Sequence, residues 1–148
     1  MKASDLMIGD YILVKPSMMP VQVAAVHNKK IGYHAVTHKL NWVREGLLEP
    51  IPITPEILEK NGFYWGYPVD VEEMASNVFG GIGIEMPPKS WVWDEGDGVV
   101  SVIFPNESDG GMITCYLDKH LTLVFDDMFV HELQHALKLC GISKNIKP

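Results

Sequence analysis

The chain has 148 residues, a formal net charge of −7 and a pI near 5.2. Its 47% hydrophobic and 21% charged residues are typical of a folded globular protein, and no apolar run is long enough to span a bilayer. The acidic balance argues against a nucleic-acid-binding protein, because phosphate contact needs a basic surface. The N-terminal residues lack the long apolar segment of a secretory signal, so we expect a cytoplasmic protein without membrane attachment.

The first fifty residues read as short strands separated by turn residues. Extended segments are predicted at 11–15, 20–26, 31–36 and 40–43, with a hairpin tip at 28–30. Short strands this close together are typical of a small curled barrel, so we predict an SH3-like β-barrel over residues 1–53.

A short helix is predicted from about residue 55 to 61. Thr54 suits the N-cap, Pro55 the first helical position, Glu56 the first turn, and Gly62 the position after the end. A second short helix is predicted to begin at Asp70.

The remaining segments predict an antiparallel sheet with a helix packed on it. One hairpin joins 91–93 to 99–104 through an acidic turn, and a second strand pair covers 112–117 and 121–125. A helix from about 127 to 140 is expected to be capped by Asp126 and Asp127 and ended by Gly141. We therefore predict an α+β fold, with residues 1–53 as the barrel and 54–148 as an α+β lobe.

The most specific chemical motif is HExxH, formed by residues 131–135 of this last helix. His131 and His135 lie one turn apart and suit two ligands of a zinc ion, while Glu132 suits the general base on a metal-bound water. By itself, this motif is typical of a zinc-dependent hydrolase.

Two observations weigh against this interpretation. On a helical wheel Phe129, Leu133 and Cys140 lie on one apolar stripe, so His131 and His135 are expected to face solvent or a cleft. The eight residues 141–148 contain no His, Asp, Glu or Cys that could supply the third protein ligand of a catalytic zinc. We therefore favour a polar helix face without metal.

Three segments resemble a known group of proteins. Residues 49–63 (EPIPITPEILEKNGF), residues 130–137 (VHELQHAL) and residues 8–12 (IGDYI) are similar to landmarks of small uncharacterised proteins from Bacteroidetes genomes, their prophages and mobile elements. In that group His131, Leu133 and Gln134 match the pattern, whereas the positions of Glu132 and His135 often hold other residues. The resemblance thus speaks against catalysis and implies a binding or helix-anchoring role for His131 and Gln134.

Other candidate sites have structural explanations that we prefer. Trp91 and Trp93 alternate on one strand and form either a ligand platform with Trp65 and Tyr67 or part of the core. The glycines at 80–83 suit a loop and lack the sequence of a phosphate-binding loop, and the acidic turn at 94–98 lacks calcium-binding spacing. Cys115 and Cys140 are expected to be buried free thiols.

These observations lead to two function hypotheses of different classes. The preferred one is a non-enzymatic interaction module that binds a protein partner in a phage or mobile-element system, without a cofactor. The alternative is a zinc hydrolase with His131 and His135 as ligands and Glu132 as base. Nucleic-acid contact through the barrel is a weaker third hypothesis.

Overall fold

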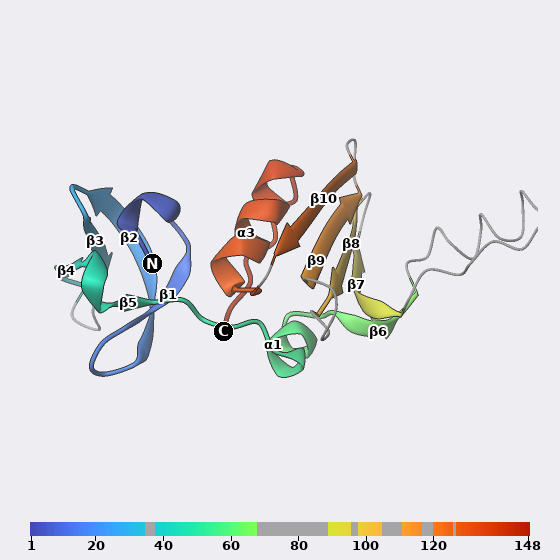
Figure 1. The fold of residues 1–148 in the computed structure, drawn as a ribbon, viewed down its shortest axis with the longest axis horizontal. Coiled ribbons are helices and arrows are strands. Elements are labelled where there is room, and N and C mark those ends of the chain that lie inside the picture. The colour runs from blue at the N-terminus through green and yellow to red at the C-terminus, as the bar shows by residue number, and fades with distance from the viewer. Residues whose placement is uncertain (35–37, 68–88, 96–97, 105–110, 117–119, 126) are drawn as a thin grey trace, which may run out of the picture. The chain divides into compact units, whose positions relative to one another are not determined.

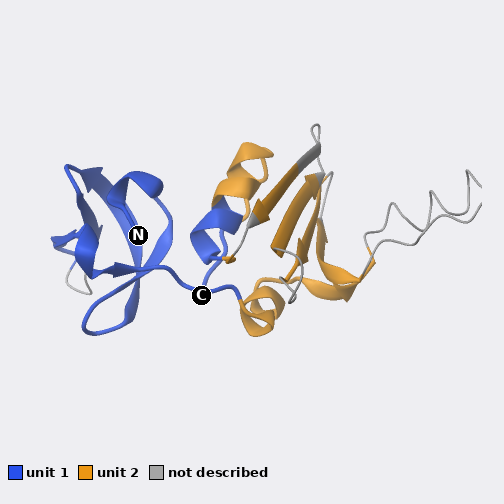
Figure 2. Cartoon of the chain, in the orientation of Figure 1, with its two compact units in different colours: residues 1–53, 129–134, 145–148 blue, residues 54–128, 135–144 orange. Residues whose placement is uncertain are grey.

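The computed structural model describes residues 1–34, 38–67, 89–95, 98–104, 111–116, 120–125 and 127–148. The fold is α+β, with two antiparallel sheets of five strands and a helix near the C-terminus (Figure 1). The chain divides into two compact units (Figure 2). Unit 1 comprises residues 1–53, 129–134 and 145–148, and unit 2 comprises residues 54–128 and 135–144.

Unit 1 contains the first five strands in the order β4-β3-β2-β1-β5. All pairings are antiparallel, and β2 pairs with both β1 and β3. The β2–β3 turn has two residues with positive φ, Asn28 at 42° and Lys29 at 59°, as a tight two-residue hairpin requires. The elements are β1 (Tyr11–Val14), β2 (Met19–His27), β3 (Lys30–His34), β4 (Leu40–Arg44) and β5 (Leu48–Glu49), with 3₁₀ helices η1 (Ala3–Asp5) and η2 (Glu45–Leu47).

The predicted strands of this unit are present, but a barrel is not confirmed. The sheet is open, and β4 and β5 are its two edges. Alternate strand residues such as Ile12, Val14, Ile31 and Val43 turn inward and form a buried core with Leu48. This small core lies entirely within the first 53 residues.

Unit 2 begins with α1 (Pro55–Lys60), where the prediction is confirmed. The Thr54 hydroxyl accepts a hydrogen bond from the Ile57 N–H at 3.3 Å, and Gly62 takes a φ of 80° just after the helix. The sheet that follows has the order β10-β9-β8-β7-β6. Its strands are β6 (Tyr64–Gly66), β7 (Ser90–Glu95), β8 (Gly98–Ile103), β9 (Gly111–Tyr116) and β10 (His120–Phe125), so both predicted strand pairs are present.

The two faces of this second sheet differ in character. Trp91 pairs with Val102 and Trp93 with Val100, and all four side chains are buried on one face. The opposite face carries buried hydroxyls, among them Ser90 and Ser101, whose oxygens lie 2.7 Å apart in a hydrogen bond. Trp91 and Trp93 thus belong to the core, as we preferred.

Helix α3 (Val130–Leu139) starts in unit 1 and ends in unit 2 (Figure 2). It begins three residues later than predicted, because Phe129 forms an antiparallel bridge with Pro52 and remains outside the helix. The proposed cap Asp127 therefore precedes the helix without capping it, and Asp126 lies outside the described residues. Its end is as predicted, since Gly141 takes a φ of 77°.

Two predictions lie outside the described residues, the short helix from Asp70 and the glycine-rich loop at 80–83. Within the described part of the chain, no helix is both long and apolar enough to cross a membrane.

Candidate functional site

The glutamate of the HExxH motif helps to cap the helix that carries it. Glu132 is the third residue of α3, and its Oε2 accepts a hydrogen bond from the Phe129 N–H at 3.1 Å. This contact is the glutamate half of a capping box. The next N–H, that of Val130, donates to the Ile51 carbonyl at 2.9 Å. Glu132 therefore has a structural role at the position where a hydrolase would need a general base.

Gln134 joins α3 to the beginning of β1. Its Oε1 accepts from the Tyr11 N–H at 3.1 Å, and its Nε2 donates to the Gly9 carbonyl at 3.3 Å and to Asn145 Oδ1 at 3.1 Å. The side chain is only 3% exposed. Each of its polar atoms is thus engaged inside unit 1, and the helix-anchoring role is the one that these contacts support.

The histidines do not form the solvent-facing stripe that the helical wheel predicted. His131 is 6% exposed and its ring stacks on that of Phe129, with centroids 5.9 Å apart and planes 12° apart. His135 is half-buried. The wheel was wrong about His131 because it allowed for one apolar face only, whereas the first half of α3 also packs within unit 1.

Around this helix, the described part of the chain holds no cluster that could bind a metal ion. Among the described residues, no three His, Cys, Asp or Glu side chains lie close enough together to bind one ion. A catalytic zinc takes three protein ligands, and the motif itself supplies two.

The three segments that carry the family resemblance meet in the structure. Gly9 and Tyr11 of the first segment bind Gln134 of the third, and Ile51 of the second binds Val130. Sequence reasoning found these landmarks separately and had no signal for their contact. Their shared role in unit 1 is to hold the start of α3 against the strands.

The tryptophans proposed as a ligand platform are divided between core and surface. Trp91 and Trp93 are 8% and 7% exposed, whereas Trp65 is 55% exposed and lies 5.7 Å from Trp91 between ring centroids. The Lys144 ammonium lies 4.6 Å from the centre of the Trp93 ring. Trp93 therefore has a cation partner within its own chain.

The two cysteines are free and buried, as predicted. Burial raises the pKa of the Cys115 thiol far above its usual range, and the neighbouring Cys140 adds to the shift. A thiol held protonated in this way is a poor nucleophile and a poor metal ligand.

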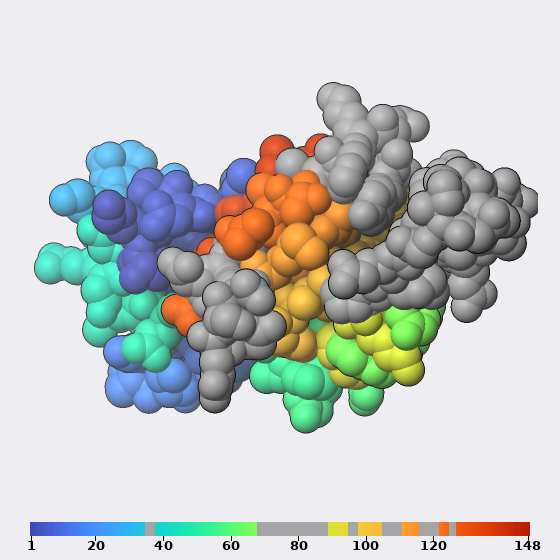
Figure 3. All heavy atoms as spheres, turned by 45° about the vertical axis from the view of Figure 1, so that its right-hand side comes forward, coloured from blue at the N-terminus to red at the C-terminus, as the bar shows by residue number. Residues whose placement is uncertain are grey.

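A different surface of unit 1 brings together residues suited to recognition. We call it the Trp42 face and define it as the outward side chains of β2–β4: His27, Lys30, Gly32, Leu40, Trp42 and Arg44. The strand register places Lys30 opposite Arg44, Gly32 opposite Trp42 and His34 opposite Leu40. Side chains of β2 to β4, coloured blue to teal, project from the surface of unit 1 in Figure 3.

Apolar side chains on this face are exposed. Trp42 is 48% exposed and Leu40 is 37% exposed. The edge of the His27 ring packs on Trp42 at 6.4 Å between centroids. Gly32 leaves no room for a side chain of its own, because a Cβ there would lie 3.0 Å from Leu40 Cδ1. The Leu40 side chain therefore packs over Gly32, which lies opposite Trp42 in the strand register.

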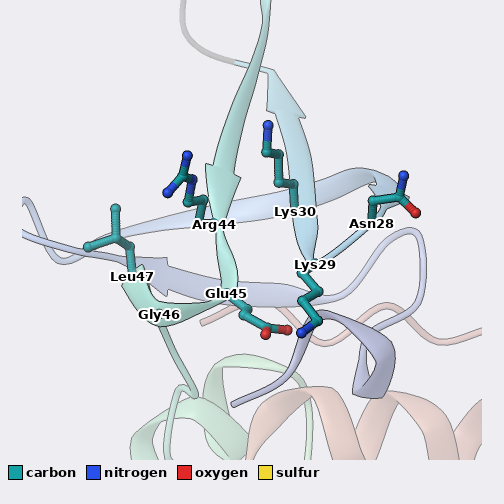
Figure 4. A pocket seen from close by; sticks show the side chains of 7 residues that line it. All are labelled: Asn28, Lys29, Lys30, Arg44, Glu45, Gly46 and Leu47. Carbon is teal, nitrogen blue, oxygen red and sulfur yellow. The ribbon is translucent and has the colours of Figure 1, made fainter.

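The cations of the face lie at one end of it. Figure 4 shows the Lys30 and Arg44 side chains extending in the same direction from adjacent strands, while Lys29 and Glu45 point the other way. They line a shallow pocket of about 570 Å³ together with Asn28, Gly46 and Leu47. Lys15 has an ion-pair partner in Glu49, but neither Lys30 nor Arg44 pairs with a carboxylate in the described part of the chain.

This arrangement carries a local electrostatic cost. Like charges directly opposite each other on neighbouring strands repel and destabilise the sheet. An anionic group placed between Lys30 and Arg44 removes that repulsion. The sequence alone gives no signal for this site, because the pairing of residue 30 with residue 44 is visible only in the strand register.

No protein-family model, curated protein or solved structure matches the chain.

Proposed function

We propose that the chain is a non-enzymatic interaction module and that the Trp42 face binds a protein partner. One observation carries the proposal: Lys30 and Arg44 lie opposite each other next to the exposed Trp42, and neither pairs with a carboxylate among the described residues. Exposed aromatic and arginine side chains contribute strongly to binding energy at protein interfaces. Partner binding would relieve both the exposure of the indole and the repulsion between the cations.

The distribution of charge supports this location. Unit 1 contains seven basic and five acidic residues, a net charge of +2, whereas unit 2 contains five basic and fourteen acidic residues, a net charge of −9. The overall acidity of the chain therefore belongs to unit 2. A modestly basic unit with an apolar centre suits a partner that presents carboxylates around an apolar residue.

The zinc-dependent hydrolase has less support. Its general base, Glu132, accepts the hydrogen bond that caps α3, and its first ligand, His131, is buried against Phe129. Both contacts are structural, and the proposed module needs neither a substrate nor a zinc ion.

We also propose that the strands of unit 1 form an open version of the SH3-like barrel. Its support is the pairing of β1 with both β2 and β5, the nine-residue β2 shared between both halves of the sheet, and η2 just before β5. The resemblance adds the expectation that the partner belongs to a cytoplasmic phage or mobile-element system.

Photo-crosslinking in a Bacteroidetes host tests this function. A photoreactive residue replaces Leu40 on the face, and in a matched chain it replaces Leu139, an exposed leucine of unit 2. We expect one defined protein adduct from position 40, reduced by about fivefold or more in a Trp42→Ala background. A Glu132→Gln background should leave it unchanged.

Two results would contradict the proposal. The first is an adduct that forms equally from positions 40 and 139, or that ignores Trp42→Ala. The second is stoichiometric zinc in the purified chain that is lost in His131→Ala, together with loss of the adduct in Glu132→Gln, which would favour the hydrolase.

A further inference from the structure

We infer that the partner of the Trp42 face binds as an extended acidic segment that adds a strand to the free edge of β4. This inference rests on the proposed function and specifies its binding mode and partner chemistry. Backbone hydrogen bonds would supply affinity, and alternate side chains of the segment would meet the face.

The edge position of β4 is the first support. β4 pairs with β3 on one side, and no described strand pairs with its other side. It is five residues long and carries the exposed Leu40 and Trp42. An exposed edge with apolar side chains is a template for another strand unless it is blocked.

The direction of the backbone groups is the second support. The Glu45 N–H donates to the Lys29 carbonyl at 3.0 Å, so residue 45 turns its backbone groups toward β3. These groups alternate along a strand. Leu40, Trp42 and Arg44 therefore turn theirs to the free edge, and an added strand would bond to the same residues whose side chains form the face.

The same alternation makes Lys30 and Arg44 a pair without direct backbone hydrogen bonds. Residues in such pairs approach more closely than hydrogen-bonded ones, with Cα atoms roughly 4.5 Å apart. The two cations thus form a compact positive site at one end of the edge, and Lys39 directly precedes the strand at its other end. Arg44 lies two residues from Trp42 on the same face, so a segment with a carboxylate two residues from an apolar residue matches this spacing, and a carboxylate on both sides matches it in either strand direction.

Single-stranded nucleic acid is the competing ligand class, because it also uses aromatic stacking and cations. The geometry favours the peptide. A free strand edge offers a row of backbone donors and acceptors that another peptide backbone can pair with and that stacked bases do not use.

The test uses the full chain and a labelled heptapeptide, Ser-Glu-Thr-Leu-Thr-Glu-Ser, followed by fluorescence anisotropy. Its palindromic sequence presents the same side chains in either strand direction. A peptide with lysine in place of both glutamates is the charge control, and a seven-residue oligo-dT represents nucleic acid. We expect saturable binding of the acidic peptide and about tenfold weaker binding of the lysine peptide.

Chain variants locate the peptide. Arg44→Glu is expected to weaken binding about tenfold, whereas Lys138→Glu, which changes the net charge equally but lies in unit 2, should change it less than about twofold. Circular dichroism spectra of both variants check that they fold. Equal effects of the two variants would overturn the assigned site.

N-methylated peptides test strand addition itself. One peptide carries the methyl group on the leucine nitrogen and the other on both threonine nitrogens, which removes N–H groups from opposite edges of the segment. If the segment adds as a strand, one of the two peptides binds about tenfold more weakly than the other. In an antiparallel strand the leucine N–H faces β4, so the leucine-methylated peptide is the weaker one. In a parallel strand the threonine N–H groups face β4, so the threonine-methylated peptide is the weaker one. Equal affinities would overturn the strand-addition mode.

The outcomes separate this inference from the proposed function. The Trp42-dependent adduct can form in cells while the acidic peptide does not bind, or while oligo-dT binds better and depends on Arg44. In either case the inferred partner chemistry is wrong, but the Trp42 face is still the interaction surface. If no Trp42-dependent adduct forms, the proposed function itself fails.

Discussion

Gln134 shows how one buried amide holds a helix to a sheet. Its three hydrogen bonds reach the Tyr11 N–H, the Gly9 carbonyl and the Asn145 side chain. We expect Gln134→Ala to lower the free energy of unfolding by about 1–3 kcal/mol, because it removes the acceptor of the half-buried Tyr11 N–H and leaves a space at a buried position. Gln22→Ala is a matched control, since the exposed Gln22 donates to the same Gly9 carbonyl at 3.0 Å. Urea unfolding should show a loss below about 0.5 kcal/mol for Gln22→Ala, and equal losses would contradict the anchoring role.

Cys115 makes the folded chain less stable at alkaline pH. Burial raises its pKa in the folded chain, so the unfolded chain releases the thiol proton first as the pH rises. Stability from this group is complete below the usual thiol pKa of about 8.5 and falls above it by about 1.4 kcal/mol per pH unit. Urea unfolding between pH 8 and pH 10 measures this slope. Cys115→Ala should have a shallower slope, and parallel slopes would show that other groups cause the loss.

At the scale of elements, the start of α3 distinguishes two roles for Glu132. A capping contact needs an acceptor oxygen, which glutamine retains, whereas a general base needs the carboxylate. Glu132→Gln should therefore leave the melting temperature nearly unchanged, and Glu132→Ala should cost about 1 kcal/mol. Asp127→Ala, at the cap that the sequence predicted, should cost less than about 0.5 kcal/mol. A larger loss for Asp127→Ala than for Glu132→Ala would restore the predicted helix start.

The elements that sequence predicts well are those fixed by nearby residues. The Asn28–Lys29 turn, the Thr54 cap and the Gly141 stop each depend on the conformational preferences of one or two residues, and all three are present. The start of α3 was misplaced because Pro52, which is distant in the sequence and outside the named strands, holds Phe129 in a bridge. Local preference favoured an earlier start, and tertiary pairing overrode it.

At the scale of the whole molecule, the candidate site depends on the same nonlocal information. His131, Glu132 and Gln134 stand out in the sequence as a motif, yet their contacts are structural. Trp42 and Arg44 have no motif, and their importance comes from the register that places them opposite Gly32 and Lys30. Net charge was misleading for a similar reason, since it averages a basic unit with a strongly acidic one.

Unit 1 is built from three separate pieces of the chain, and this has a consequence for its stability. Residues 1–53 contain a core of their own, but Ile51, Leu133 and Ile146 are also buried, and the last two come from the C-terminal pieces. A domain this small is marginally stable alone. We therefore expect the fragment 1–53 to fold weakly and to melt at a lower temperature than the full chain.

A peptide of residues 129–148 should raise that melting temperature when it is added in trans, because a ligand that binds only the folded state stabilises it in proportion to its affinity. The same peptide with Gln134→Ala is the matched control and should stabilise the fragment less, since it cannot bond to Gly9 and Tyr11. Circular dichroism melts at increasing peptide concentration give the measurement. A fragment that melts like the full chain, or that responds equally to both peptides, would show that the strands of unit 1 do not depend on residues 129–148. The anchoring role of Gln134 would then have to be abandoned.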